Sequence, residues 1–217
     1  MSAWDERAER YRTSQTHAEG DDLDAVVELC NPHAGVKILD VATGGGHVAR
    51  RLRDEGAEVV TCDASRGMQP DVVTPAEHLP FADGSFDVVV SRIAAHHFDD
   101  LGAALGEMIR VSNRVLVVED MLYRSEEEHE AEKLRDPTHN RSLTAEEWRD
   151  VLVEAGLEIE QELFFSKEHD FDEWLARTDC AGPDAERVRE LLAQYSSDDG
   201  SSWSNDYIVV KARKSQR

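Results

Sequence analysis

Three consecutive glycines inside residues 36–49 constrain the fold of this chain more than any other feature. The segment contains a short run of apolar and β-branched residues and then the glycines, and the sequence His-Val-Ala-Arg-Arg-Leu follows at residues 47–52. The first part is typical of a buried strand and the last part of a helix. Glycines let the backbone approach a ligand closely, and the first N–H groups of a helix are free to donate hydrogen bonds. The segment therefore predicts a strand–turn–helix unit that binds a ligand rich in hydrogen-bond acceptors.

Two classes of cofactor use such a turn. Gly44-x-Gly46-x-x-Ala49 satisfies the dinucleotide fingerprint, and Asp63 lies near the offset of about 20 residues expected for the acid that binds a ribose. A nicotinamide-dependent oxidoreductase is therefore one interpretation. Asp40 favours another, because a carboxylate directly before the turn is unfavourable beside a pyrophosphate and favourable beside a cationic ligand.

Strand-like and helix-like segments alternate after the glycine turn. Residues 58–63, 71–74, 86–90 and 114–120 predict further strands, and residues 101–110 predict a helix. A capping box at Thr144 opens another helix, which ends at Gly156. Residues 157–160 and 206–211 predict a final antiparallel pair, with helices at 171–175 and 185–195 between them. This alternation predicts an α/β fold with a mostly parallel sheet.

Two sequence motifs resemble those of a known family. One is Asp40-x-x-x-Gly44-x-Gly46, and the other is residues 79–91, Leu-Pro-Phe-Ala-Asp-Gly-Ser-Phe-Asp-Val-Val-Val-Ser. Both resemble the class I S-adenosylmethionine-dependent methyltransferases, in particular the small-molecule group similar to the ubiquinone and menaquinone C-methyltransferases. Nicotinamide dehydrogenases do not carry the second phrase, so the resemblance favours methyl transfer with S-adenosylmethionine as cofactor.

The resemblance implies a doubly wound, seven-stranded, mostly parallel sheet of order 3-2-1-4-5-7-6, with the last strand antiparallel and helices on both faces. It also implies an N-terminal helical lid over residues 1–34, a methyltransferase domain over 35–217, and a helical insertion at about 168–200 that forms a small cap. The pattern of Tyr11, Ser14 and His17 before Gly20 is the part that resembles the lid.

The resemblance further implies a set of cofactor-binding residues, in which Asp63 accepts the ribose hydroxyls. Two departures from the family pattern bear on it. Pro75 stands where an aspartate would bind the adenine, and residues 64–70 leave room for only one helical turn. Because of these departures, a catalytically inactive protein that still binds the cofactor is an alternative interpretation. The expected cofactor-binding residues are Tyr11, His17, Asp40, Ala42, Gly44, Gly46, Asp63, Ala64, Met68, Ala76, Glu77 and Ser91.

Candidate catalytic residues follow the fourth strand, because open α/β sheets bind ligands at the carboxyl ends of their strands. His96 and His97 lie there, and histidine is a base near neutral pH, so either could deprotonate an acceptor. A structural role for the pair is the alternative. Arg92, His139 and Arg141 are candidate contacts to the acceptor, for which the resemblance suggests a small quinone-like or other aromatic molecule.

The charge of the chain limits its partners. A formal net charge of −22 repels the phosphates of nucleic acids, so a small-molecule substrate is expected instead. The chain contains five lysines against nineteen arginines, and its acids are spread along the whole sequence. This pattern suggests adaptation to a cytoplasm of high salt, where screening reduces repulsion between carboxylates.

Other features of the composition point to the same kind of protein. The three cysteines, Cys30, Cys62 and Cys180, have no metal-binding spacing, which indicates reduced thiols and no metal site. The sequence shows neither an apolar run that could span a membrane nor a signal peptide at its start. We therefore expect a cytoplasmic monomer or homodimer.

Overall fold

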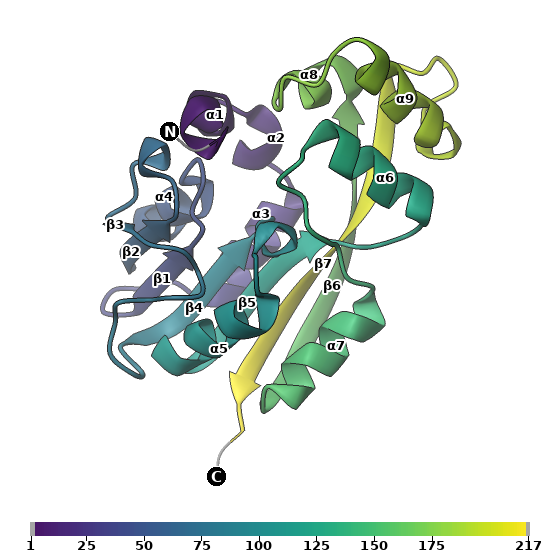
Figure 1. Ribbon diagram of the computed structural model, residues 1–217. Helices are drawn as coiled ribbons and strands as arrows, with labels where there is room; N and C mark the ends of the chain where they lie inside the picture. Colours follow the sequence, from purple (N-terminus) through teal and green to yellow (C-terminus); the bar gives the residue numbers. More distant parts are fainter. Residues whose placement is uncertain (1–2, 216–217) are drawn as a thin grey trace.

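The computed structural model describes residues 3–215, apart from the side chains of Ala3 and Gln15. Its centre is a seven-stranded sheet of order β3-β2-β1-β4-β5-β7-β6 (Figure 1). β7 pairs antiparallel with both β5 and β6, and the other pairings are parallel. The expected fold and strand order are confirmed. The strands are β1 Lys37–Val41, β2 Glu58–Asp63, β3 Val72–Val73, β4 Phe86–Arg92, β5 Ser112–Met121, β6 Leu157–Asp170 and β7 Ser202–Lys214.

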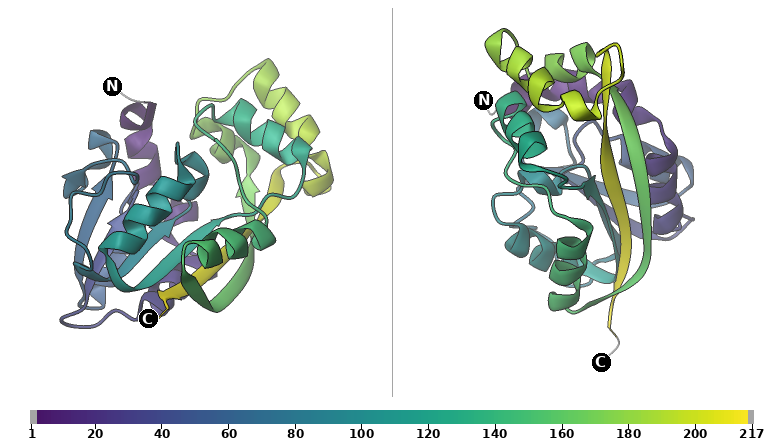
Figure 2. Two further views of the ribbon diagram at one scale, coloured as in Figure 1. Left: turned by 60° about the horizontal axis from the view of Figure 1, so that its bottom comes forward. Right: turned by 90° about the vertical axis from the view of Figure 1, so that its right-hand side faces the viewer.

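Helices cover both faces of this sheet, α3 (Asp21–Cys30) and α4 (His47–Asp54) on one, α5 (Leu101–Val111) and α7 (Ala145–Glu154) on the other (Figure 2). Alternate residues of a strand point to opposite faces, so the central strands supply both cores. In β1, Ile38 packs in the core under α3 and α4, whereas Leu39 packs in the core under α5 and α7. This two-sided burial explains why the strands are almost wholly apolar.

A third apolar core holds a helical cap above one end of the sheet. The cap consists of α6 (Glu126–Arg135), α8 (Phe171–Ala176), α9 (Pro183–Leu191) and the 3₁₀ turn η3 (Ala193–Tyr195). Its core gathers Phe171, Trp174, Leu192 and Trp203, each less than 5% exposed. The sequence predicts α8 and α9 but does not predict α6.

β6 and β7 are much longer than expected, 14 and 13 residues instead of four and six. Their outer halves pair with each other as far as Asp170 and Ser202, beyond the rest of the sheet. β6 alternates half-buried and exposed residues in most of that part, and its charged residues conceal the strand pattern. The extension positions the cap above the carboxyl ends of the parallel strands.

Two N-terminal helices, α1 (Ala3–Arg12) and α2 (Gln15–Ala18), lie at this same end of the sheet. The chain after β2 forms only a 3₁₀ turn, η1 (Arg66–Met68), as the sequence predicts. α1 packs directly on η1, where an Asp5 carboxylate oxygen accepts hydrogen bonds from Ser65 Oγ at 2.7 Å and Gly67 N at 2.8 Å. A Cβ at Gly67 would lie 2.8 Å from Asp5 Cα, so glycine permits this close approach.

Within residues 3–215, no helix is long and apolar enough to cross a lipid bilayer. The same residues contain no group of three or more His, Cys, Asp or Glu side chains arranged to hold a metal ion.

Candidate active site

A cavity of about 470 Å³ lies where β1, β2 and β4 end at their carboxyl termini. A cavity of this size suits a cofactor or a small ligand, and the carboxyl edge of an open α/β sheet is the usual place for one. Its walls come from the glycine turn, the start of the segment after β2, residues 74–77, the segment after β4, the N-terminal helices and residues 137–140.

The glycine turn forms the floor of the cavity. Gly44 and Gly46 have φ values of 51° and 73°, a region that L-residues rarely adopt, and Ala42 joins them at 54°. The turn is fixed from below, since Thr43 N donates to the carbonyl of Cys62 at 3.0 Å and Thr43 Oγ1 to the Asp40 carboxylate at 2.7 Å. Gly44 thus lies in the cavity wall, while Gly46 begins α4 outside it.

Two carboxylates face the turn. Asp63 is half-buried and accepts hydrogen bonds from Gly44 N at 3.0 Å and Ser65 N at 2.8 Å. Asp40 is 2% exposed, and burial raises its pKa to about 7. Burial also raises the pKa of Asp63, against the effect of its backbone hydrogen bonds. Both groups would gain from a cationic or hydroxyl-bearing ligand in the cavity.

The far end of the cavity is formed by Met68, Thr74, Pro75, Ala76 and Glu77. The Glu77 carboxylate already accepts hydrogen bonds from the backbone N–H groups of Asp99 and Asp100 at 3.0 and 3.3 Å, near the start of α5.

The N-terminal helices close the cavity over the glycine turn. Trp4, Tyr11 and His17 line it, and His47 Nε2 lies 2.9 Å from the Tyr11 carbonyl. Arg50 has only donors and bonds His47 Nδ1 at 2.7 Å, so the His47 proton must be on Nε2, which donates to Tyr11. Helix α1 is therefore hydrogen-bonded to the start of α4.

α1 is also tied to the cap on its other side. Arg7 Nη1 donates to the Asp136 carboxylate at 2.9 Å, and Arg10 Nη1 donates to the Ala176 carbonyl at 2.9 Å. The N-terminal segment therefore bridges η1, the glycine turn and the cap. α3, in contrast, packs in the core of the sheet.

Arg92 lines the cavity, but its guanidinium has partners within the protein. It pairs with Asp22 and with Glu119 at 2.6 Å, and it donates to the His17 carbonyl at 3.0 Å. Burial disfavours the Asp22 charge, yet Arg92 and Lys167 hold the pKa of Asp22 at about 2. Because all three nitrogens of the Arg92 guanidinium bond groups of the protein, Arg92 fixes the segment between α2 and α3.

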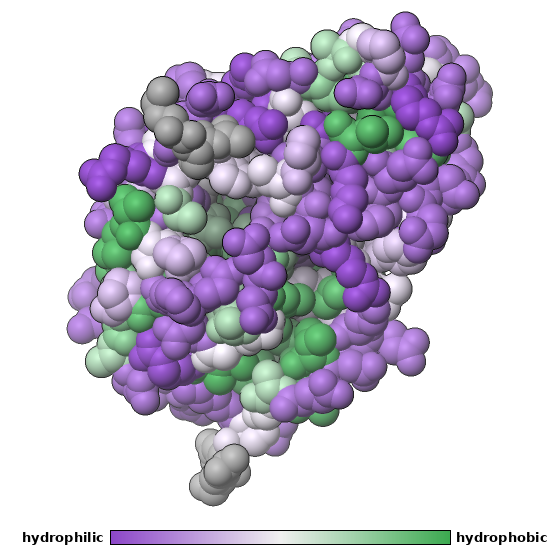
Figure 3. Space-filling model, in the orientation of Figure 1, coloured by the Kyte–Doolittle hydropathy of each residue, from purple (hydrophilic) through white to green (hydrophobic). Residues whose placement is uncertain are grey.

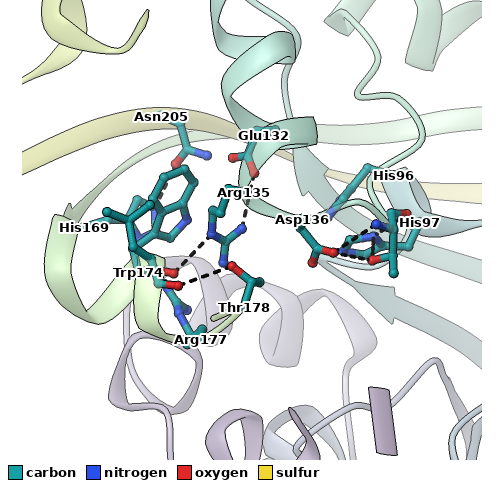
Figure 4. A network of polar contacts seen from close by, with 12 residues as sticks. His96, His97, Glu132, Arg135, Asp136, His169, Trp174, Arg177, Thr178 and Asn205 are labelled. Carbon is teal, nitrogen blue, oxygen red and sulfur yellow. Dashed lines mark hydrogen bonds and ion pairs between the residues drawn. The ribbon is translucent and has the colours of Figure 1, made fainter. Parts of the chain in front are cut away.

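The two adjacent histidines have different surroundings (Figure 4). His96 is 5% exposed, does not line the cavity, and bonds the Asp120 carboxylate through Nδ1 at 2.5 Å. His97 does line the cavity, with its Nδ1 3.0 Å from the Thr138 carbonyl and its ring 4.7 Å from that of Trp4. A carbonyl can only accept, so the neutral His97 ring carries its proton on Nδ1 and a lone pair on Nε2.

The structure does not bring four other predicted residues to the cavity. Ser91 is 1% exposed within β4. His139 is 3% exposed with its ring 5.4 Å from that of His129 in α6, and burial lowers the pKa of His139 to about 3. Gly46 lies behind the turn, and Arg141 is exposed and paired with Glu147. The other predicted cofactor residues, Tyr11, His17, Asp40, Ala42, Gly44, Asp63, Ala64, Met68, Ala76 and Glu77, all line it.

Comparison with known proteins identifies the family. A profile for the methyltransferase domain matches residues 39–114. The uncharacterised methyltransferase YcgJ of Bacillus subtilis is 29% identical over 208 residues, 85% of this chain and 81% of that protein. A candidate methyltransferase of Bacillus halodurans C-125 superposes with a TM-score of 0.80 at 28% identity, covering 91% of this chain and 100% of that one. The chain belongs to the S-adenosylmethionine-dependent methyltransferases.

This methyltransferase also shares 37% identity over 108 residues with the demethylmenaquinone methyltransferase of Beutenbergia cavernae. That match covers 44% of the chain and 45% of the relative. The family assignment replaces the nicotinamide-dependent oxidoreductase as the interpretation of the glycine turn.

The cavity of the methyltransferase fits S-adenosylmethionine by its donors and acceptors. Asp63 offers a half-buried carboxylate suited to two adjacent hydroxyls, and the buried Asp40 offers an anion near the turn for a cationic group. Sequence reasoning assigned no role to His47, Phe98, Thr138 or Asn140, which also line the cavity. The position of His47 directly after the glycines is a sequence signal for its place in the site. Phe98, Thr138 and Asn140 reach the site only through tertiary contacts.

Proposed function

We propose that this methyltransferase transfers the methyl group of S-adenosylmethionine to a small aromatic acceptor of quinol type. The observation that carries this proposal is the composition of the cavity wall away from the glycine turn. Trp4, Ile93, Phe98 and Pro137 present apolar surface there, with the His97 ring beside them. Such a wall suits a flat apolar molecule. The demethylmenaquinone methyltransferase similarity supports an acceptor of this class.

The cofactor would occupy the side formed by the glycine turn. We propose that Asp63 accepts the ribose hydroxyls, as its position at the end of β2 favours. Met68, Ala76 and Glu77 would enclose the adenine, where Pro75 offers no acceptor. Asp40, close to the turn, would favour the cationic end of the cofactor. The remaining predicted contacts, Tyr11, His17, Ala42, Gly44 and Ala64, surround these positions.

When bound, S-adenosylmethionine supplies an electrophilic methyl group on a positively charged sulfur. The protein then has to align the acceptor, exclude water and accept a proton. His97 is the candidate base. Its Nδ1–H is fixed on the Thr138 carbonyl, and burial together with the neighbouring His96 lowers its pKa well below the ordinary value. The ring is therefore neutral, with a lone pair on Nε2, when the acceptor hydroxyl loses its proton.

Mass spectrometry of a reaction with S-adenosylmethionine and 1,4-naphthohydroquinone tests this function. The native protein should yield a product that carries one additional methyl group. His97→Gln removes the base and should lower kcat by about 10²-fold, the usual contribution of a general base, with little change in KM for the cofactor. His33→Gln is the matched control, because His33 is exposed and does not line the cavity, and it should leave kcat unchanged. Absence of methylated product from the native protein would contradict the proposed acceptor class.

A further inference from the structure

Asp136 is a buried carboxylate to which the proposed reaction assigns no role. Most residues on the molecular face in Figure 3 are hydrophilic, whereas Asp136 is only 1% exposed. It caps the C-terminus of α6, where its N–H donates to the Glu132 carbonyl at 2.8 Å. A buried carboxylate is costly unless hydrogen bonds and positive charge compensate it. The partners of Asp136 therefore indicate what it does.

The hydrogen bonds to the Asp136 carboxylate converge on one oxygen, Oδ1. Thr138 N donates to it at 3.0 Å, Thr138 Oγ1 at 2.7 Å and Arg7 Nη1 at 2.9 Å. The other oxygen, Oδ2, is buried and has no hydrogen-bond partner within residues 3–215. Burial disfavours the charge, but His97, Thr138 and Arg7 hold the pKa of Asp136 at about 2. Asp136 is therefore an anion near neutral pH.

Thr138 connects this anion to His97, and the two side chains lie near each other in Figure 4. The hydroxyl hydrogen of Thr138 is used in the bond to Asp136, because a carboxylate can only accept. The hydroxyl oxygen, 3.2 Å from His97 Nδ1, must then accept from that nitrogen, as the Thr138 carbonyl does at 3.0 Å. Both contacts require the proton on Nδ1 and leave the lone pair on Nε2.

The loop that carries Asp136 is held against the segment of His97. Asn140 N donates to the His96 carbonyl at 2.8 Å. Asn140 Nδ2 donates to the carbonyls of His97 at 3.1 Å and Phe98 at 2.9 Å. These bonds fix the position of the carboxylate relative to the ring, so its charge acts on the ring from a constant place.

Other titratable groups around His97 oppose a positive charge on its ring. Burial lowers the pKa of His97, and two neighbouring histidines, with ring centroids at 4.0 and 6.3 Å, lower it further. Asp136 acts in the opposite direction and raises it. Arg7, which lies on α1 and is paired with Asp136, reduces that effect by its own charge. The two neighbouring histidines are His96 and His139.

We propose that Asp136 is a positioning residue for methyl transfer, which acts through Thr138 to keep one proton on His97 Nδ1 and to stabilise the cation that forms when His97 accepts a second. This inference rests on the proposed function, because it takes His97 as the base. The acceptor O–H bond breaks, its electron pair stays on the oxygen, and the proton forms an Nε2–H bond on His97. The ring then carries one positive charge, which the fixed carboxylate compensates.

Kinetics with S-adenosylmethionine and 1,4-naphthohydroquinone test this role. Asp136→Asn keeps the shape and removes the charge, so kcat should fall about tenfold while KM for the cofactor is unchanged. Asp71→Asn is the matched control. Asp71 likewise accepts hydrogen bonds from the N–H and the hydroxyl of one threonine, Thr61, and from Arg53, and none of the three lines the cavity. This control should leave kcat unchanged.

Histidine NMR separates the proposed role from a purely structural one and needs no acceptor. Labels at Cε1 of the nine histidines, with His97 assigned from His97→Gln, report the pH between 8 and 4 at which the ring gains its second proton. Asp136→Asn should lower this midpoint and Arg7→Met should raise it, so that the two differ by at least about one pH unit. A ring that stays neutral to pH 4 has the lower midpoint. Loss of the α1 contact alone would shift both variants in the same direction, because both break the ion pair.

Thr138→Val guards against a folding defect in the charge variants, because it keeps the carbonyl contact and both charges and removes only the hydroxyl. It should lower kcat as Asp136→Asn does, and Thr138→Ser, which keeps the hydroxyl, should retain the native kcat. Equal kcat for native protein, Asp136→Asn and Thr138→Val would overturn the proposal, and so would midpoints of Asp136→Asn and Arg7→Met that move together. Midpoints in the predicted order without any methyl transfer would support the action of Asp136 on His97 and contradict the proposed reaction. Methyl transfer by the native protein with kcat and midpoints unchanged in the variants would do the reverse.

Discussion

Asp40 is a carboxylate of the cavity wall that is almost completely buried, and burial changes its ionisation. It is 2% exposed, accepts a hydrogen bond from Thr43 Oγ1, and has a pKa raised by burial to about 7. Near neutral pH, the free protein therefore holds Asp40 as a mixture of acid and carboxylate. A cationic ligand in the cavity favours the carboxylate, so ligand binding and proton release are linked.

This linkage predicts that the affinity for S-adenosylmethionine rises with pH. With a pKa near 7, about one-tenth of Asp40 is ionised at pH 6 and about nine-tenths at pH 8, so Kd should fall about tenfold over that interval. Isothermal titration calorimetry at pH 6, 7 and 8 measures the change. Asp40→Asn keeps the shape and cannot ionise, so it should bind more weakly with a flat pH profile. A profile of the variant as steep as that of the native protein would assign the titration to another group.

At the scale of elements, α1 is held by partners on three sides. η1, the start of α4 and the cap each contact it, through Asp5, the Tyr11 carbonyl and Arg7 respectively. Gly45 is the closest approach, since a Cβ there would lie 2.5 Å from the Tyr11 carbonyl oxygen and 2.7 Å from His47 Nε2. The glycine turn therefore serves both the ligand and the docking of α1.

Gly45→Ala should displace α1 from the turn. Trypsin cleavage after Arg7, Arg10 and Arg12 measures the displacement, because these arginines lie within α1. The cleavage rate should rise at least about fivefold, the effect of losing roughly 1 kcal/mol of local stability. Gly106→Ala adds the same methyl group where no described atom outside the backbone of α5 lies within 4 Å, and it should leave the rate unchanged. Equal rates for the two variants would show that α1 is not held by this contact.

The elements differ in how far the sequence predicts them. β1 and β4 are buried on both faces, so their apolar runs identify them, and local turn chemistry identifies the glycine floor with Asp40 and Asp63. α6 buries Glu128, Glu132 and Arg135 through ion pairs, so hydrophobic periodicity does not reveal it. Parts of the candidate site cannot be predicted from local sequence patterns either. Contacts such as His97 to Thr138 and Asn140 to Phe98 join segments about 40 residues apart, and no local pattern encodes them.

At the scale of the whole molecule, the large excess of negative charge is the main property to explain. The net charge of −22 implies self-repulsion, and many of the arginines are paired with carboxylates at the surface, such as Arg149 with Glu162 and Arg189 with Asp172. Salt screens both the pairs and the repulsion, but the excess of carboxylates makes the repulsion the larger effect. We therefore propose that the protein is adapted to high salt.

Thermal unfolding at rising potassium chloride concentration tests this proposal. Between 0.1 M and 2 M salt, Tm should rise by at least about 5 °C, equivalent to roughly 2 kcal/mol for a domain of this size. The buried cluster of Asp22, Arg92 and Lys167 is shielded from the solvent and should contribute little to the change. A Tm that is constant or falls with salt would contradict the adaptation.

Calorimetric titration of S-adenosylmethionine into the native protein, Asp63→Ala and Asp83→Ala tests the central claim most directly. If the cavity beyond β1 and β2 binds the cofactor through its ribose, the native protein binds one molecule per chain. Loss of a hydrogen-bonded carboxylate should then weaken binding by Asp63→Ala about 10- to 100-fold. Asp83→Ala, which alters an exposed carboxylate paired with Arg110, should bind as the native protein does. No heat of binding in the native protein, or the same Kd for native protein and Asp63→Ala, would contradict the account.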